Sequence, residues 1–344
     1  MMMKIPSEKE LHMLSEATFR KTADVGLKNA EANQPYIGKT IKDLKREMSE
    51  KPPKPAIVIS AGPSLHRKRS IETIKKANGN CHIIAVDGAL GHCLRNGVIP
   101  DFVITVDPDE HRIIRWFGDP RLDERPEDDY FRRQDLDPAL NTNELARNRE
   151  LIQLVNSYGP GITTIISTSV TPEITLRCRD AGMRLYWWNP LYDDYEKSDS
   201  VSRKIYQMNH VTCMVTGGNV GSSAWVFAHS ILNSPDVVLV GMDFSYPPGT
   251  NVLNTQYYTI LKELFPDQPS HGLIEIHNPY LNETWLTDPG YYWYSQCFLQ
   301  MAPHASCKTY NCTEGGILFG EGIVFSGLAD TLQDLLTKKE HSHG

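Results

Sequence analysis

The stretch AIVISAGPSLHRK (Ala56–Lys68) decides how the chain is predicted to fold. Its first four residues are apolar and mostly β-branched, as in a strand buried on both faces, and the run breaks at Gly62-Pro63-Ser64. Gly62 leaves room in a tight turn, and Pro63 suits the first position of a helix. N–H groups after such a turn would face a phosphate at the positive end of the helix. A plain strand-to-helix connection has the same letters, so the stretch alone leaves both interpretations open.

Short apolar runs of the same kind recur at the spacing of a parallel sheet. CHIIAVD (81–87) and DFVITVD (101–107) follow the first run, separated by helix-compatible segments that end in glycine. The pattern resumes at GITTIIST (161–168), RLYWWNP (184–190) and DVVLVGMDFSYPPG (236–249). Alternation of strand and helix predicts an α/β protein with a Rossmann-like, doubly wound, mostly parallel sheet and helices on both faces.

Polar residues gather where these runs end, which is where open parallel sheets bind ligands. TGGN (216–219) is a second Gly-rich junction, and it precedes a helix-compatible segment. Gly217 and Gly218 let the backbone approach a ligand, whereas Asn219 either caps the helix or reads a sugar or base edge. Asp87 ends the second strand of the Rossmann-like unit, which is the place for a group that binds a ribose or base hydroxyl.

Asp107-Pro108-Asp109 has the letters of a DxD metal motif. Two carboxylates at a strand end can hold Mg²⁺ against a diphosphate. Pro108, however, constrains the turn, and aspartate is equally common as a helix cap. The sequence therefore leaves metal binding here as one of two interpretations.

His277 lies in the aromatic segment after the last core strand, where a base for a hydroxyl acceptor would be placed. A histidine whose pKa lies near the working pH is a natural general base. A histidine in a surface loop would fit the same sequence pattern. Tyr257 and Tyr258 would line the same cleft or pack a helix.

The chain divides into three parts by composition. Residues 1–50 are polar with apolar positions spaced as on helices, and they end at KPPKP (51–55). We expect this helical extension to pack on the core or to join a second copy in a homo-oligomer. Residues 55–326 form the Rossmann-like nucleotide-binding and catalytic domain, with a charged, proline-rich surface insertion at 118–150. Residues 327–344 form a C-terminal helix and tail.

Composition excludes several classes of protein. The 344 residues contain 42 acidic and 35 basic side chains, a net charge of -7, which argues against nucleic acid as a partner. The seven cysteines lack zinc-ligand spacing and are typical of a reducing compartment. No apolar run reaches the ~20 residues of a membrane span, and the first residues lack the apolar core of a signal peptide. We expect a cytoplasmic protein.

Five segments in order resemble one family. VISAGPSL, GVIPDFVITVDP, TGGNVGSSAWVFAH, VVLVGMDFSY and NCTEGG are similar to the MptE-like family. It includes the motility accessory factor (Maf) flagellin glycosyltransferases and 6-hydroxymethylpterin pyrophosphokinases. The resemblance covers roughly residues 55–325. TGGNVGSSA followed by VVLVGMDF also looks like bacterial sialyltransferases that use CMP-sialic acid.

The resemblance implies nucleotide binding and glycosyl transfer. A nucleotide-activated sugar, specifically a CMP-linked nonulosonic sugar, would be transferred to a hydroxyl of a protein or glycan acceptor. His277 would deprotonate that hydroxyl while Tyr257 and Tyr258 steady the departing phosphate, with no metal or cofactor required. The residues expected to bind the nucleotide are Gly62, Pro63, Ser64, Asp87, Asp107, Thr216, Gly217, Gly218, Asn219 and Asp243.

The same resemblance leaves two alternatives. In a 6-hydroxymethylpterin pyrophosphokinase, ATP would donate a diphosphate and Mg²⁺ would bridge the phosphates, held by Asp107 and Asp109. In a non-catalytic nucleotide-binding protein, the N-terminal helices would serve assembly.

Overall fold

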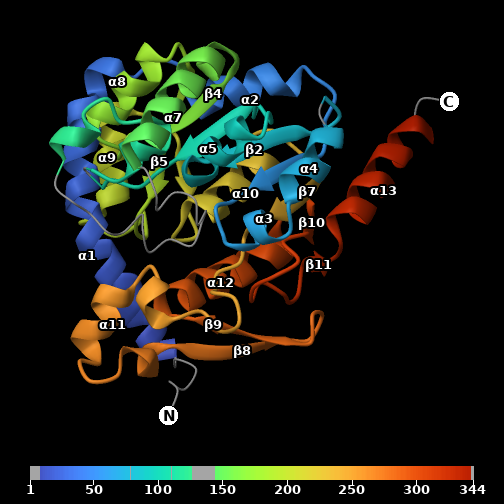
Figure 1. The fold of residues 1–344 in the computed structure, drawn as a ribbon. Helices are drawn as coiled ribbons and strands as arrows, with labels where there is room; N and C mark the ends of the chain where they lie inside the picture. Colours follow the sequence, from blue (N-terminus) through green and yellow to red (C-terminus); the bar gives the residue numbers. More distant parts are fainter. Residues whose placement is uncertain (1–7, 78, 110, 126–143, 342–344) are drawn as a thin grey trace.

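The centre of the structure is a parallel β-sheet whose strands come from most of the chain (Figure 1). The structure is a computed structural model, and it describes residues 8–77, 79–109, 111–125 and 144–341. Within these residues the sheet has nine strands in the order β11-β10-β7-β1-β2-β3-β4-β5-β6, with every neighbouring pair parallel. The strands are β1 (Ala56–Ile59), β2 (His82–Val86), β3 (Phe102–Thr105), β4 (Thr163–Ser167), β5 (Arg184–Leu191), β6 (Cys213–Val215), β7 (Asp236–Val240), β10 (Lys308–Asn311) and β11 (Ile323–Phe325).

Helices connect most of these strands, and an antiparallel hairpin of β8 (Ile274–Asn278) and β9 (Glu283–Thr287) stands apart from the main sheet (Figure 1). The predicted Rossmann-like, doubly wound α/β fold is confirmed. The α-helices that the structure describes are α1 (Glu8–Asn33), α2 (Ile41–Ser49), α3 (Ser64–Arg67), α4 (Ser70–Ile74), α5 (Asp87–Arg95), α7 (Glu144–Tyr158), α8 (Pro172–Asp180), α9 (Val201–Asn209), α10 (Val220–Ser230), α11 (Tyr258–Leu264), α12 (Pro289–Met301) and α13 (Leu328–His341).

The strand order reverses between β1 and β7. From β1 the chain adds one strand after another as far as β6, and it then returns to place β7 on the other side of β1. The carboxyl ends of parallel strands lie at one edge of a sheet, so the turns after β1 and β7 meet there. This edge is the topological switch point of the fold.

The reversal also places helices on opposite faces, because crossovers between parallel strands are right-handed. Val103 of β3 packs in one cluster with apolar residues of α5, α7 and α8. Its neighbour Ile104 points the other way, into a cluster with Trp225 and Phe227 of α10. Both faces of the sheet are thus buried, which is why its strands read as continuous apolar runs.

Two segments differ from the simple strand-helix alternation. The helix-compatible segment after β1 is split into α3 and α4, because Arg69 adopts a left-handed conformation with φ 52°. The insertion predicted at 118–150 falls partly outside the described residues, and its final part begins α7. The predicted C-terminal helix is present as α13, and the division of the chain into three parts stays a prediction.

The N-terminal segment packs on the sheet domain. The buried Asn33 at the end of α1 donates to Thr168 O (3.0 Å) and Val170 O (2.6 Å), and it accepts from Thr175 Oγ1 (2.8 Å). Beyond α1, Thr40 forms a parallel bridge with Trp187 of β5. Among the described helices, none is long and apolar enough to cross a membrane.

We predict that Asn33→Ala lowers the free energy of unfolding by about 2–3 kcal/mol, because two buried carbonyl groups lose their donors. Urea denaturation measures the change. Asn254→Ala, at an exposed position near the 3₁₀ turn Val252–Asn254, is the matched control and should change stability by less than about 0.5 kcal/mol. Equal effects for the two variants would contradict the anchoring role of Asn33.

Candidate functional site

The turns after β1 and β7 interlock at the switch point. Gly62 N donates to Gly241 O (2.8 Å), and Ser64 N donates to Asp243 Oδ2 (3.3 Å). The Ser64 hydroxyl also donates to Asp243 Oδ1. These N–H groups therefore have partners inside the protein, and a carboxylate stands at the place where the sequence suggests a phosphate.

Three glycines make this interlock sterically feasible. A Cβ on Gly62 would lie 2.2 Å from Asp243 Oδ2, and one on Gly315 would lie 2.0 Å from Ser64 Oγ. Gly316 has φ +77°, and a Cβ there would lie 2.3 Å from Asp243 O. The NCTEGG segment after β10 thus completes the switch point, which explains why a glycine pair follows that strand.

A cavity of about 500 Å³ lies at the carboxyl ends of the strands, in the size range of small-molecule sites. Ser64 is buried beneath it, bonded to Asp243. The other residues expected to bind a nucleotide all line it: Gly62, Pro63, Asp87, Asp107, Thr216, Gly217, Gly218, Asn219 and Asp243.

The three expected catalytic residues do not meet in this cavity. Tyr257 lines it, with its hydroxyl 3.3 Å from that of Tyr294. Tyr258, at the start of α11, is not among the lining residues. His277 has an exposed side chain on β8, also outside the lining. His277 is separated from the cavity because β8 pairs with β9 in a hairpin of its own and not with the main sheet.

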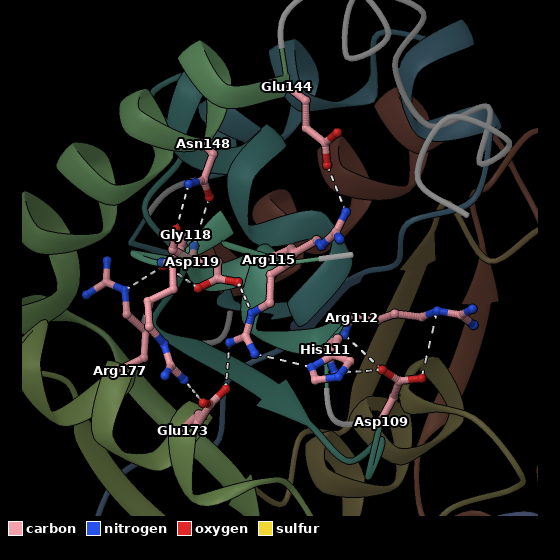
Figure 2. Close-up of polar contacts among 12 residues, drawn as sticks. Asp109, His111, Arg112, Arg115, Gly118, Asp119, Glu144, Asn148, Glu173 and Arg177 are labelled. Atoms are coloured by element: carbon pink, nitrogen blue, oxygen red, sulfur yellow. Dashed lines mark hydrogen bonds and ion pairs between the residues drawn. The ribbon is translucent and has the colours of Figure 1, made fainter. Parts of the chain in front are cut away.

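The Asp107-Pro108-Asp109 motif does not place two carboxylates at the cavity. Asp107 lines the cavity, whereas Asp109 Oδ1 accepts from the backbone N–H groups of His111 (2.9 Å) and Arg112 (2.8 Å). Figure 2 shows the Asp109 carboxylate turned towards these two residues. Among the described residues no group of three or more His, Cys, Asp or Glu side chains could hold a metal ion. The residues thus do not fit a Mg²⁺ site on Asp107 and Asp109.

Asn219 caps α10. Its Oδ1 accepts from Ser222 N (2.9 Å), and its Nδ2 donates to Gly217 O (3.2 Å). Gly217 and Gly218 have φ values of +59° and +82°, a region that disfavours side chains. The cap and the two glycines direct the positive end of a helix of 11 residues towards the cavity.

The cavity is acidic. Its lining includes three aspartates but, among the described residues, no lysine, arginine or histidine. Burial raises the pKa of Asp87 to about 7, with a smaller contribution from the negative charge of Asp107. Burial likewise raises the pKa of Asp243 to about 7, although hydrogen bonds from Ser64 oppose the rise. Carboxyl groups with such pKa values exchange protons near neutral pH.

Aromatic side chains that sequence reasoning does not assign form much of the remaining wall. The run YYWYSQCF near the start of α12 is the sequence signal for them, whereas α1 carries no comparable signal. Burial raises the pKa of the hydroxyls of Tyr192, Tyr246, Tyr257 and Tyr294, so these groups are neutral. The unassigned aromatic residues of the wall include Phe19, Trp116, Tyr192, Tyr246, Tyr291, Trp293 and Tyr294.

A polar network fixes the loop that carries Trp116. Arg125 pairs with Asp119 (2.9 Å) and with Glu173 of α8 (2.7 Å), and Arg115 pairs with Glu144 of α7 (2.8 Å). Figure 2 shows the contact between Arg115 of the loop and Glu144 of α7. Arg115, Arg125 and Asp119 are largely shielded from water, so salt screens these pairs less than it screens surface ion pairs.

Comparisons with known proteins support the family resemblance and the fold. Residues 27–116 match the model of the family described as 6-hydroxymethylpterin diphosphokinase MptE-like. The resemblance to the MptE-like family is confirmed over this segment. The chain is also similar to the structure of Maf glycosyltransferase from Magnetospirillum magneticum AMB-1, with a TM-score of 0.51 and 15% sequence identity.

Because the sequence identity is low, this likeness is evidence for the fold alone. It covers 89% of this chain and 42% of the Maf chain, so the protein spans about two fifths of that structure's length. No curated protein matches the chain. The MptE-like segment contains β1, β2 and β3 with the cavity residues Asp87 and Asp107, and it ends at Trp116.

We predict that Gly62→Ala lowers the free energy of unfolding by about 2–3 kcal/mol, because the added Cβ would overlap Asp243 and the Gly241 carbonyl. Chemical denaturation measures the loss. Gly38→Ala is the control, since a Cβ there would meet nothing within 4 Å. A loss below about 1 kcal/mol for Gly62→Ala would contradict this prediction, because it would mean that the two turns move apart to accept a Cβ at little cost.

Proposed function

We propose that the protein is a glycosyltransferase that uses a nucleotide-activated sugar, specifically a CMP-linked nonulosonic sugar, and transfers it to a hydroxyl acceptor. The observation that carries this proposal is the cavity at the switch point, where doubly wound folds bind nucleotides. Two Gly-rich turns and the buried Asp87 line it. Similarity to a Maf glycosyltransferase supports the reaction class.

The donor phosphate would be held without a basic side chain. The first turn of α10 presents its positive end to the cavity, and the neutral hydroxyls of Tyr257 and Tyr294 lie in the same wall. Fixed donors of this kind stabilise the charge that grows on a departing phosphate. We therefore assign the phosphate to the Gly217–Asn219 junction rather than to the Gly62–Ser64 turn.

Asp87 is the base in this proposal. It lines the cavity with a pKa near 7, and its Oδ1 accepts from Gly88 N (2.7 Å), whereas both oxygens of Asp243 accept hydrogen bonds from Ser64. The acceptor oxygen forms a bond to the anomeric carbon as the bond from that carbon to the phosphate oxygen breaks. The acceptor proton passes to Asp87, and CMP leaves with the bonding electron pair.

The second candidate is transfer of a diphosphate from ATP to a pterin-like alcohol, favoured by the family match over residues 27–116. It would need phosphates to be neutralised in an acidic cavity, and Asp109 is turned away from it. Glycosyl transfer therefore fits these side chains better than diphosphate transfer does. A non-catalytic nucleotide-binding protein is the third outcome to be tested.

We predict that CMP and CMP-sialic acid raise the thermal midpoint of unfolding, and that EDTA does not remove the effect. The compounds to compare are these two, UDP-sugars, and ATP with Mg²⁺, each measured by a thermal-shift assay. Stabilisation by ATP with Mg²⁺ alone would overturn the glycosyltransferase proposal and favour the second candidate. Binding of CMP-sialic acid with neither transfer nor hydrolysis would favour a non-catalytic protein.

We predict that Asp87→Asn lowers kcat by at least about 100-fold and leaves CMP affinity within about threefold, because a general base acts in the chemical step. In the unmodified protein, kcat/KM should rise with pH through about 7, as the carboxyl loses its proton. Asp334→Asn, an exposed carboxylate on α13, controls for loss of a charge. An Asp87→Asn variant with an unchanged pH profile would exclude this residue as the base.

A further inference from the structure

One face of α1 follows the carboxyl edge of the sheet. Asn29 Nδ2 donates to Ser169 O (2.8 Å) and Pro108 O (3.3 Å), which lie in the turns after β4 and β3. One turn further along the helix, Asn33 bonds to the same turn after β4. Side chains three and four residues apart share a helix face, so both amides anchor the same face of α1.

The same face then meets the segment after β5. Gly26 packs against Tyr192, and a Cβ there would lie 2.0 Å from the Tyr192 hydroxyl oxygen. Tyr192 itself lines the cavity. The absence of a side chain at Gly26 thus allows α1 to lie directly against a wall of the cavity.

Further towards the N-terminus, the same face enters the cavity lining. Phe19 and Thr22 both line the cavity, and they continue the three- and four-residue spacing that leads to Gly26, Asn29 and Asn33. Asp24, Val25 and Lys28 are exposed, on the other side of the helix. The N-terminal helix is therefore a component of the site, and Phe19 and Thr22 lie outside the segment that matches the MptE-like family.

The position of α1 separates it from the expected nucleotide. It is anchored on the turns after β3 and β4, whereas the switch point lies between β1 and β7 on the other side of β2. The wall near α1 is aromatic and hydroxyl-bearing, because Tyr192 packs in one cluster with Phe19 and both line the cavity together with Thr22. Rings of this kind cover the apolar C–H face of a sugar, and hydroxyls bond to its rim.

We propose that α1 forms the wall of the site that contacts the transferred sugar, so that Phe19 and Thr22 select the donor sugar. The proposal rests on the proposed function for the nucleotide half of the site. Asn29 and Asn33 are positioning residues, because they act by holding α1 against the sheet. The helix thereby has a binding role in place of the assembly role considered for it from sequence.

The first experiment compares two ligands on the full-length protein by titration calorimetry. For Phe19→Ala, we expect the Kd of CMP to stay within about twofold and that of CMP-sialic acid to rise about tenfold. Lys28→Ala, on the exposed face of the same helix, should change neither value. An equal loss for both ligands, or no loss for either, would overturn the proposal.

A second variant keeps the test decisive if Phe19→Ala disturbs α1, since Phe19 also packs in the cluster that contains Leu27 and Tyr192. Thr22→Cys is treated with an alkylating reagent, and its peptide is quantified by mass spectrometry, with Asp24→Cys on the exposed face as the control. We expect CMP-sialic acid, but not CMP, to slow alkylation at position 22 at least about fivefold. Equal rates with the two ligands would overturn the assignment to the sugar.

The two proposals fail in different ways. If the unmodified protein binds neither CMP nor CMP-sialic acid, the proposed function fails, and the assignment of α1 to a donor sugar fails with it. If the unmodified protein binds both ligands while the position 19 and position 22 variants behave as their controls do, only the role of α1 is rejected.

Discussion

The bond between Ser64 and the buried Asp243 joins the two turns that meet where the strand order reverses. A carboxylate in this position is costly unless it is hydrogen-bonded, and the pKa of about 7 shows that burial outweighs the bonds it receives. Gly62 and Gly315 have no side chain because the carboxylate and the serine hydroxyl occupy that space. This contact therefore fixes how the turns after β1 and β7 meet, at the edge of the cavity that Gly62 and Asp243 line.

The fold and most of the cavity could be predicted from sequence because both follow from local patterns. Strands of a parallel sheet are buried on both faces, so β1, β2 and β3 appear as apolar runs. Because the strands are parallel, their carboxyl ends lie at one edge of the sheet, where Asp87, Asp107 and the Gly217–Asn219 turn line the cavity. No pairing of distant residues had to be known for this result.

The remaining features depend on contacts between distant segments, which local patterns do not encode. The Gly62 turn has the letters of a phosphate-binding turn, yet its N–H groups bond to residues almost 180 positions away. His277 falls outside the cavity because its hairpin does not join the main sheet. Phe19 enters the cavity because amides ten and fourteen residues later fasten α1 to the turns after β3 and β4.

The charge of the cavity limits the chemistry that it can support. With three aspartates and no basic side chain among its described lining, it offers no ion pair to a phosphate. Backbone N–H groups at the start of α10 and neutral tyrosine hydroxyls are then the donors available, and they act through fixed dipoles. Such donors suit a phosphate monoester that leaves with one added charge better than a triphosphate. This is the physical reason for preferring glycosyl transfer from a nucleoside monophosphate sugar to diphosphate transfer from ATP.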